Sequence, residues 1–342
     1  MRTKRFFIVA CLVLAFGGLL VVGIIFGCWP YEDLRIAKDP GATYDERLAA
    51  VRRLTHQASL ADIAKTTEDM NVGREAVDRL THQKRLADVA KNAEDIFVRA
   101  AAAGRLTDEA LLVDLAKNDP YDNVRLAAVQ QLGDIAQSAH QALFADLAKN
   151  DVARDPPCEG CGHWHANVRA AAVYRLTDQA VLAEYAKNDE DPVVRAMAMH
   201  PLTDQAVLAD IAKTHEDKHT RRVAAEHLTD QAALVEIAQN DEDKYVRAAA
   251  MKNLTDQALL ADFAKNDKDV TVRAAAVENL TDVVMLSDLE KNDDAWQINR
   301  AARRRLGELL PETRRQRMSP SGFPLPPGIP PSSPVHQDYR EK

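Results

Sequence analysis

The residues best suited to chemistry lie together near the middle of the chain. Within eight residues the sequence places Cys158, Cys161, His163 and His165. Thiolate and imidazole groups are the ligands that tetrahedral Zn²⁺ prefers in proteins. Structural zinc sites usually take their second pair of ligands from a distant segment, whereas here one residue separates Cys161 from His163. The pattern predicts a zinc site, with His140 from a smaller insertion nearby as a substitute for one of the four ligands.

The same cysteines support two other interpretations. In an oxidising compartment Cys158 and Cys161 can form a strained disulfide, and otherwise they can remain thiols without a further role. A catalytic redox pair is the other interpretation, although no thioredoxin-like βαβ pattern surrounds it. No general base at a diagnostic spacing accompanies the loop, so it does not indicate a hydrolase.

This loop interrupts a regular repeat. Leucine recurs every 26 residues, with a single step of 44, at Leu54, Leu80, Leu106, Leu132, Leu176, Leu202, Leu228, Leu254, Leu280 and Leu306. We call these the register leucines. Self-similarity of this kind is the signature of a repeat architecture. The eighteen additional residues of the long step fall in two places: about six near Ile135 to His140, and about twelve within residues 152–167, VARDPPCEGCGHWHAN.

One period, residues 254–280, predicts two short helices. Thr255 is a candidate N-cap of the first helix, and Asp269 is a candidate N-cap of the second. An apolar stripe at helical spacing runs along the first helix at Leu260, Phe263 and Ala264. One hairpin cannot bury its stripes alone, so copies must stack. We predict an all-α fold: an α-solenoid of about ten two-helix repeats over residues 31–310, preceded by an N-terminal transmembrane or signal helix.

Two charged columns run through the repeats. Arginine stands seven residues before most register leucines, at Arg47, Arg99, Arg125, Arg169, Arg195, Arg221, Arg247 and Arg273. Aspartate stands four residues before the arginine at Asp69, Asp95, Asp191, Asp217, Asp243 and Asp269. The arginines could form a line of positive charge for an anionic ligand. We favour a structural ladder, in which aspartate and arginine pair within a unit and arginine also reaches loop carbonyls of its neighbour.

The pattern D-x-D-x-x-V-R-x-A-A-x-x-x-L from Asp267 to Leu280 resembles the second helix of HEAT repeats, particularly the short bacterial HEAT-like kind. The 26-residue period is also similar to that of leucine-rich variant repeats, which alternate an α-helix with a 3₁₀-helix. The resemblance covers roughly residues 31–310. It implies a scaffold or binding surface. Some short HEAT-like proteins attach bilin chromophores, but no motif here supports that activity.

The N-terminus predicts a membrane anchor. A basic segment, residues 1–5, precedes an uncharged run from Phe6 to Phe26, which would span roughly 31 Å as a helix. The positive flank places residues 1–5 in the cytoplasm and the repeats on the extracytoplasmic side of an anchor at 6–28. A lipoprotein is the alternative, because Ile25-Phe26-Gly27-Cys28 resembles a lipoprotein box that would lipidate Cys28. A simple secreted chain is the third interpretation.

Composition excludes some partners. The formal net charge is −8 and the isoelectric point is near 5.7, so we predict no nucleic-acid partner. The two residues before each register leucine vary most between repeats, as in Tyr174-Arg175, Glu226-His227 and Lys252-Asn253. This variable strip is either a recognition surface or a drifting solvated face. Residues 311–342 are rich in Pro and Ser, which predicts a disordered tail of polyproline character.

We therefore predict a membrane-anchored, extracytoplasmic HEAT-like repeat scaffold that binds a protein partner. We predict no enzyme, because the repeats supply no nucleophile–base pair and no phosphate-cradling glycine loop. The alternative is a metal-binding or redox-active protein that uses Cys158, Cys161, His163 and His165.

Metal analysis tests this alternative. If the loop holds zinc, the purified protein should contain about one Zn²⁺ per chain under reducing conditions, as a four-ligand structural site requires. The double variant Cys158→Ser, Cys161→Ser should lose it. Protein without bound metal under reducing conditions would exclude the zinc site.

Overall fold

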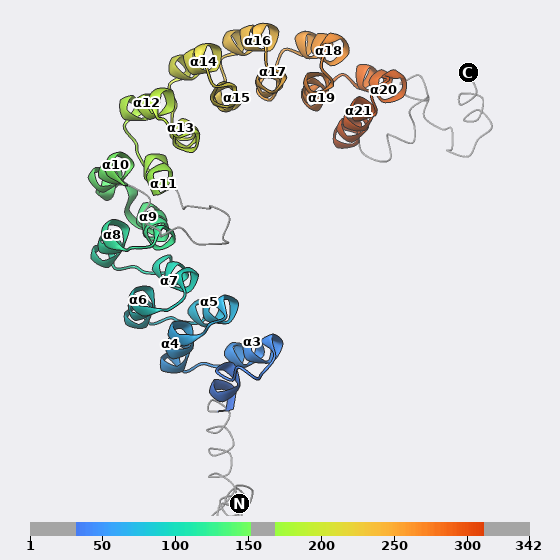
Figure 1. Ribbon diagram of the computed structural model, residues 1–342. Coiled ribbons are helices and arrows are strands. Elements are labelled where there is room, and N and C mark those ends of the chain that lie inside the picture. Colours follow the sequence, from blue (N-terminus) through green and yellow to red (C-terminus); the bar gives the residue numbers. More distant parts are fainter. Residues whose placement is uncertain (1–31, 152–167, 311–342) are drawn as a thin grey trace, which may run out of the picture. The chain divides into compact units, whose positions relative to one another are not determined.

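The computed structural model describes residues 32–151 and 168–310 of the chain (Figure 1). It divides into two units, one up to Leu176 and one from Thr177 onward. All regular secondary structure in the described residues is helical, which confirms the predicted all-α class for this part of the chain.

The helices follow one another as pairs of a first and a second helix. The first unit contains α3 (Tyr44–Arg53), α4 (Gln57–Thr66), α5 (Met70–Asp78), α6 (Gln83–Asn92), α7 (Ile96–Ala103), α8 (Glu109–Asn118), α9 (Asp122–Ala136), the 3₁₀-helix η1 (Gln137–His140), α10 (Gln141–Asn150) and α11 (Val168–Tyr174). The second unit contains α12 (Gln179–Asn188), α13 (Pro192–Met199), α14 (Gln205–Thr214), α15 (Lys218–His227), α16 (Gln231–Asn240), α17 (Lys244–Met251), α18 (Gln257–Asn266), α19 (Val270–Asn279), α20 (Val283–Asn292) and α21 (Trp296–Leu309). Residues 32–37 are also helical, and Asp33 of this helix accepts from Arg53 of α3.

Aspartate begins most of these helices. In the period from Leu254 to Leu280, Asp269 caps α19 as predicted, since its side chain accepts from the backbone N–H of Thr271. The prediction for α18 is wrong by one residue: the cap is Asp256, which accepts from the backbone N–H groups two and three residues on. Thr255 is instead bonded to the preceding repeat.

The predicted apolar stripes form the core. Leu260, Phe263 and Ala264 of α18 are buried, and all ten register leucines are buried as well. Each buried leucine contributes about 2 kcal/mol of burial free energy. Ala275 of α19 is only half-buried, and it lines a groove described below.

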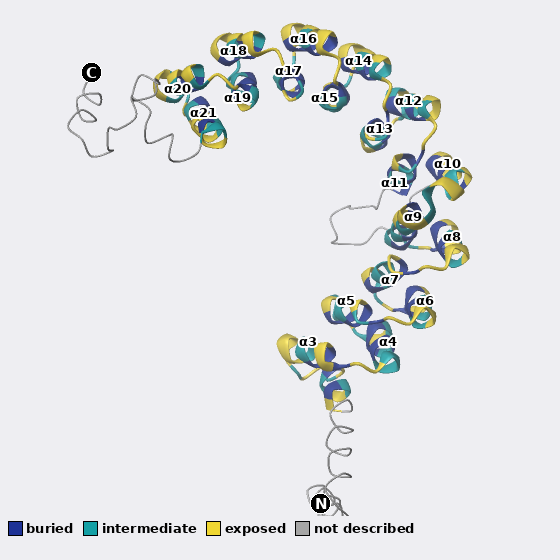
Figure 2. Ribbon diagram, turned by 180° about the vertical axis from the view of Figure 1, so that it is seen from behind, coloured by how far each residue is buried: buried dark blue, intermediate teal, exposed yellow. Residues whose placement is uncertain are grey.

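The two rows of helices differ in how closely they pack. Within each unit the second helices of successive repeats pack closely against one another, whereas the first helices, apart from α4 and α6, approach their neighbours less. A stack of this kind bends toward its closely packed row. In each unit taken alone the second helices therefore form the inner, concave row, and Figure 2 shows the buried faces of both rows turned toward neighbouring helices.

A glutamine at the start of most first helices ties successive repeats together. Gln231 Oε1 accepts from the backbone N–H and the hydroxyl of Thr255, both at 2.9 Å, and Gln231 Nε2 donates to the carbonyl of Asn253 at 3.0 Å. The glutamine–threonine bond recurs at Gln57–Thr81, Gln83–Thr107, Gln179–Thr203, Gln205–Thr229 and Gln257–Thr281. This explains why the threonine does not cap its own helix.

The arginine column also joins repeats, but not as predicted. Arg221 donates to Asp241 of the next repeat at 2.8 and 3.2 Å, and its Nη1 donates to the loop carbonyls of its own repeat, at His215 and Glu216. Arg247 and Arg195 bond in the same way. The predicted arrangement is therefore reversed: the carboxylate comes from the neighbour and the carbonyls from the same repeat. Because the arginines are mostly buried here, they cannot serve an external anionic ligand.

Two departures from the arginine column follow from this geometry. Gly73 replaces arginine, and the position that would carry the receiving aspartate, twenty residues on, is Ala93. A Cβ at Gly73 would lie 2.6 Å from the side chain of Val98, because the next repeat closes into the space. In the last repeat Asn299 keeps only the bonds to carbonyls of its own repeat, at Leu289 and Asp293.

Removal of one such arginine should destabilise the second unit. Arg221→Met leaves the Asp241 carboxylate without its bidentate partner, and we expect a loss of about 3 kcal/mol in the free energy of unfolding. Urea unfolding followed by circular dichroism measures it. Arg300→Met, at an exposed position of α21, is the matched control and should change the free energy by less than about 0.5 kcal/mol. Equal urea midpoints for the two variants would contradict the structural role.

Candidate functional site

The predicted metal ligands cannot be placed. Cys158, Cys161, His163 and His165 lie in residues 152–167, outside the described part of the chain. Among the residues that the structure does describe, no group of three or more His, Cys, Asp or Glu side chains is arranged to hold a metal ion. The predicted substitute, His140, lies at the end of η1, where its Nε2 is 3.0 Å from Glu109 Oε2. The zinc and disulfide interpretations therefore stay predictions.

The predicted anchor at 6–28 and the tail at 311–342 also lie outside the described ranges. Among the helices of residues 32–151 and 168–310, none has the length and apolar character needed to cross a bilayer.

Half of the predicted variable strip has a structural role. The residue directly before the register leucine donates to backbone carbonyls of the preceding repeat: Gln131 Nε2 to Leu106 at 2.8 Å, and Asn253 Nδ2 to Leu228 at 2.9 Å. Similar bonds are made by Arg79, Arg105, Arg175, Asn279 and Arg305. Arg, Gln and Asn are interchangeable here because each of these side chains can reach a carbonyl, and Pro201 and His227 are the exceptions. Neither interpretation of the strip, as a recognition surface or as a drifting solvated face, includes this structural role.

The other half of the strip faces solvent. Two residues before the register leucine, the side chain lies on the inner face of its second helix and is exposed in almost every repeat: Arg52, Asp78, Gly104, Gln130, Tyr174, His200, Lys252, Glu278 and Arg304. Side chains at this position do not make the same bond from one repeat to the next. These residues remain the recognition candidates from the sequence.

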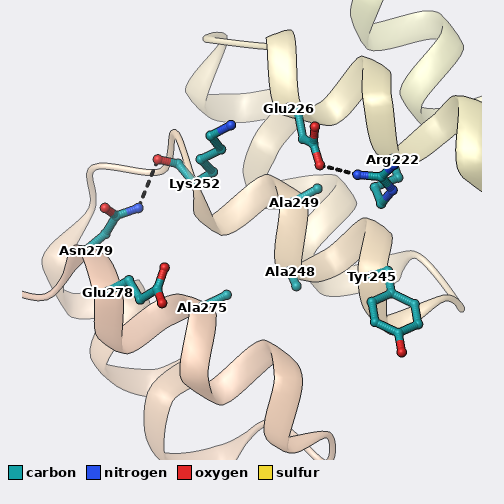
Figure 3. Close-up of a pocket in the computed structure, with 9 residues that line it drawn as sticks. All are labelled: Arg222, Glu226, Tyr245, Ala248, Ala249, Lys252, Ala275, Glu278 and Asn279. Carbon is teal, nitrogen blue, oxygen red and sulfur yellow. Dashed lines mark hydrogen bonds and ion pairs between the residues drawn. The ribbon is translucent and has the colours of Figure 1, made fainter. Parts of the chain in front are cut away.

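A groove on the inner face of the second unit collects several of them. It has a volume of 360 Å³ and is lined by residues of α15, α17 and α19 (Figure 3): Arg222, Glu226, Tyr245, Ala248, Ala249, Lys252, Ala275, Glu278 and Asn279. The sequence reasoning missed Tyr245, Ala248 and Ala249. Their spacing before Lys252, at seven, four and three residues, is the signal that could have placed them on one helical face.

Small and aromatic side chains form the apolar part of this groove. Ala248, Ala249 and Ala275 leave the backbones of α17 and α19 open to approach, and Tyr245 stands beside them with 53% of its surface exposed. In Figure 3 the Tyr245 ring points away from its helix. Lys244 Nζ lies 5.3 Å from the ring centroid, a cation–π distance that restrains the ring.

The charged side chains of the groove balance one another. Arg222 pairs with Glu226 one turn along α15. Glu278 pairs with Arg304 of α21 at 2.6 Å, and Lys252 is exposed. The lining thus carries two cations, Arg222 and Lys252, and two anions, Glu226 and Glu278. A groove without net formal charge favours neutral, apolar ligand segments over highly charged ones.

A histidine pair lies at the repeat junction next to the groove. The rings of His200 and His227 are 4.6 Å apart between centroids and nearly perpendicular. Burial lowers the pKa of His227 from its ordinary value of 6.5, the charge of His200 lowers it further, and Lys252 acts in the same direction against the opposing charge of Glu226. His227 occupies the position from which other repeats bond to the preceding carbonyl.

No protein-family model matches the sequence, and no curated protein matches it. The class of the protein therefore rests on the sequence register and the structure, which agree on an all-α chain of repeated helix pairs.

The histidine pair predicts a pH dependence of stability. Because the pKa of His227 is lower in the folded state, the unfolded state binds more protons as the pH falls below about 6.5. The free energy of unfolding should be highest above that value, and it should fall until the pH reaches the folded-state pKa. His227→Asn should flatten this slope, since asparagine at the same position in other repeats bonds to carbonyls without titrating.

Urea midpoints measured from pH 5 to pH 8 test this. The control is His219→Asn, at an exposed position of the same helix, which should keep the wild-type slope. A slope unchanged in His227→Asn would assign the pH dependence to other groups.

Proposed function

We propose that this chain is a non-enzymatic scaffold of HEAT-like repeats that binds a protein partner on the inner face of its second helices. In the proposal residues 6–28 anchor it to a membrane, with the repeats on the extracytoplasmic side. The partner contacts the groove of α15, α17 and α19, and Tyr245 is the central contact.

This proposal rests on one observation: on the second helices, the residues that bond to neighbouring repeats and the residues that stay exposed occupy different positions. The arginine column and, in most repeats, the residue before the register leucine form bonds that join repeats, and the glutamine of most first helices does the same. On the inner face, Tyr245 and Lys252 remain exposed although they stand in the same repeat. Side chains that are not needed to join the repeats can differ to suit a partner, and the stacking of the repeats stays the same.

The groove has the features of a small interface core. Exposed tyrosine is among the side chains enriched at binding hot spots, where it combines a large apolar area with few rotatable bonds. The alanine floor allows close approach of a partner backbone, and ion-paired walls supply polar contacts at the rim. Because the helices are held by bonds on both sides, binding requires little further ordering of the array.

The resemblance to HEAT repeats supports the scaffold class. Val272, Arg273 and the alanines that follow match the pattern of the second HEAT helix, and in this structure the same stretch places arginine at the repeat junction and Ala275 on the groove floor. The repeated sequence thus builds the stack and the binding surface together.

Partner capture with variants of the groove tests the proposal. After crosslinking in membranes, purified wild-type protein should return a reproducible partner, and Tyr245→Ala or Lys252→Glu should reduce its recovery about tenfold, the loss expected for a hot-spot residue. Tyr44→Ala, an exposed tyrosine on a second helix of the first unit, is the matched control and should have no effect.

Circular dichroism must show that the variants stay folded. Recovery that falls only in unfolded variants, or falls equally in Tyr44→Ala, would reject the groove as the binding surface.

A further inference from the structure

The groove of the second unit suits a neutral, extended peptide. Its floor of Ala248, Ala249 and Ala275 is shallow, Tyr245 stands at one end, and its four charged residues cancel. An aromatic ring beside small residues is the surface on which polyproline segments dock, because the rings of proline pack on the aromatic face. Such segments are already extended in solution, so they lose little entropy on binding.

The chain itself contains a segment of this composition. Residues 318–334, MSPSGFPLPPGIPPSSP, include seven prolines, the apolar residues Phe323, Leu325 and Ile329, and no charged side chain. The segment therefore matches the groove both in polyproline character and in its lack of charge. Three basic residues of the tail, Arg314, Arg315 and Arg317, precede the segment, and Arg340 and Lys342 follow it.

The last helix of the array brings the chain close to the groove. Arg304 of α21 pairs at 2.6 Å with Glu278, a lining residue, and α21 packs against α19. Only seven residues, 311–317, separate the end of the described array from the proline-rich segment, and they reach at most about 25 Å when extended. Covalent attachment through a short linker gives an effective concentration on the order of millimolar, so even weak binding would fill the groove.

We propose that residues 318–334 bind the groove of α15, α17 and α19 in the same chain. Prolines and Phe323 pack on Tyr245 and the alanine floor, and Lys252 donates to carbonyls of the segment. The inference rests on the proposed function in one respect: if the groove is also the partner site, the tail competes with the partner, and a partner must displace it.

Photocrosslinking in the full chain tests the inference. With p-benzoylphenylalanine in place of Phe323, irradiation of dilute protein should give intramolecular adducts that mass spectrometry maps to residues 245–252 and 275–279. Tyr245→Ala should reduce their yield about tenfold, in line with the loss of a principal contact. Tyr44→Ala should leave the yield unchanged.

A second variant avoids any change to the array. Pro326→Gly with Pro327→Gly alters only the tail and should also reduce the yield, because glycine removes the preference for the extended polyproline conformation. Adducts at other places, adducts only between chains, or a yield that neither variant lowers would overturn the inference.

The same variants separate this inference from the proposed function. If adducts form in the groove but Tyr245→Ala does not reduce partner recovery, the groove is not the partner site and tail binding still holds. Capture that depends on Tyr245 without groove adducts would reject tail binding alone. If both hold, Pro326→Gly with Pro327→Gly should increase partner recovery severalfold, because it frees the groove.

Discussion

The structure depends on one constraint: a helix pair this small cannot satisfy its own polar groups or bury its own stripes. The buried arginine shows how the constraint is met. Arg221 can be buried only because its own loop supplies carbonyls and the next repeat supplies the Asp241 carboxylate. An isolated hairpin would keep the loop carbonyls but would lack the carboxylate, so each repeat is completed by its neighbour. The last described repeat follows the same rule, because Asn299 keeps the bonds to its own carbonyls and the described residues contain no further repeat for it to join.

Much of this architecture could be predicted from the sequence, because the regular spacing of a few residues determines where the helices lie. Ten register leucines fix the length and phase of each pair, and the aspartate before the second helix identifies its start. What could not be predicted is which neighbour a polar side chain bonds to. Arg221 has several plausible acceptors in the sequence, and the nearer one, Asp217 of its own repeat, is not the one it pairs with. Only the packing of the helices selects Asp241 of the next repeat. The same limit applies to Thr255. Its position in the sequence predicts a helix cap, but it donates to Gln231 of the preceding repeat instead.

The candidate site was harder to predict for a related reason. Variation between repeats does not by itself identify recognition residues. One of the two variable positions needs, in most repeats, only a donor that reaches a carbonyl, and Arg, Gln and Asn all provide it. The residues that form the groove include alanines, which the repeat pattern predicts to be buried. Ala248, Ala249 and Ala275 lie near the edge of the buried stripe, where a helix turns from its neighbours toward the open side.

Those alanines link stability to binding in this array. A large side chain at Ala249 or Ala275 would keep α17 and α19 apart, weaken the bonds that need close repeats, and fill the groove at the same time. Small residues let the second helices pack closely, which bends the unit and makes their exposed side the concave one. Two successive alanine-rich second helices therefore form a shallow concave surface. In the second unit, the exposed Tyr245 stands at one end of this surface and offers a large contact area. The site is therefore a consequence of how the repeats stack, and its specificity comes from the few inner-face residues that stacking leaves unconstrained.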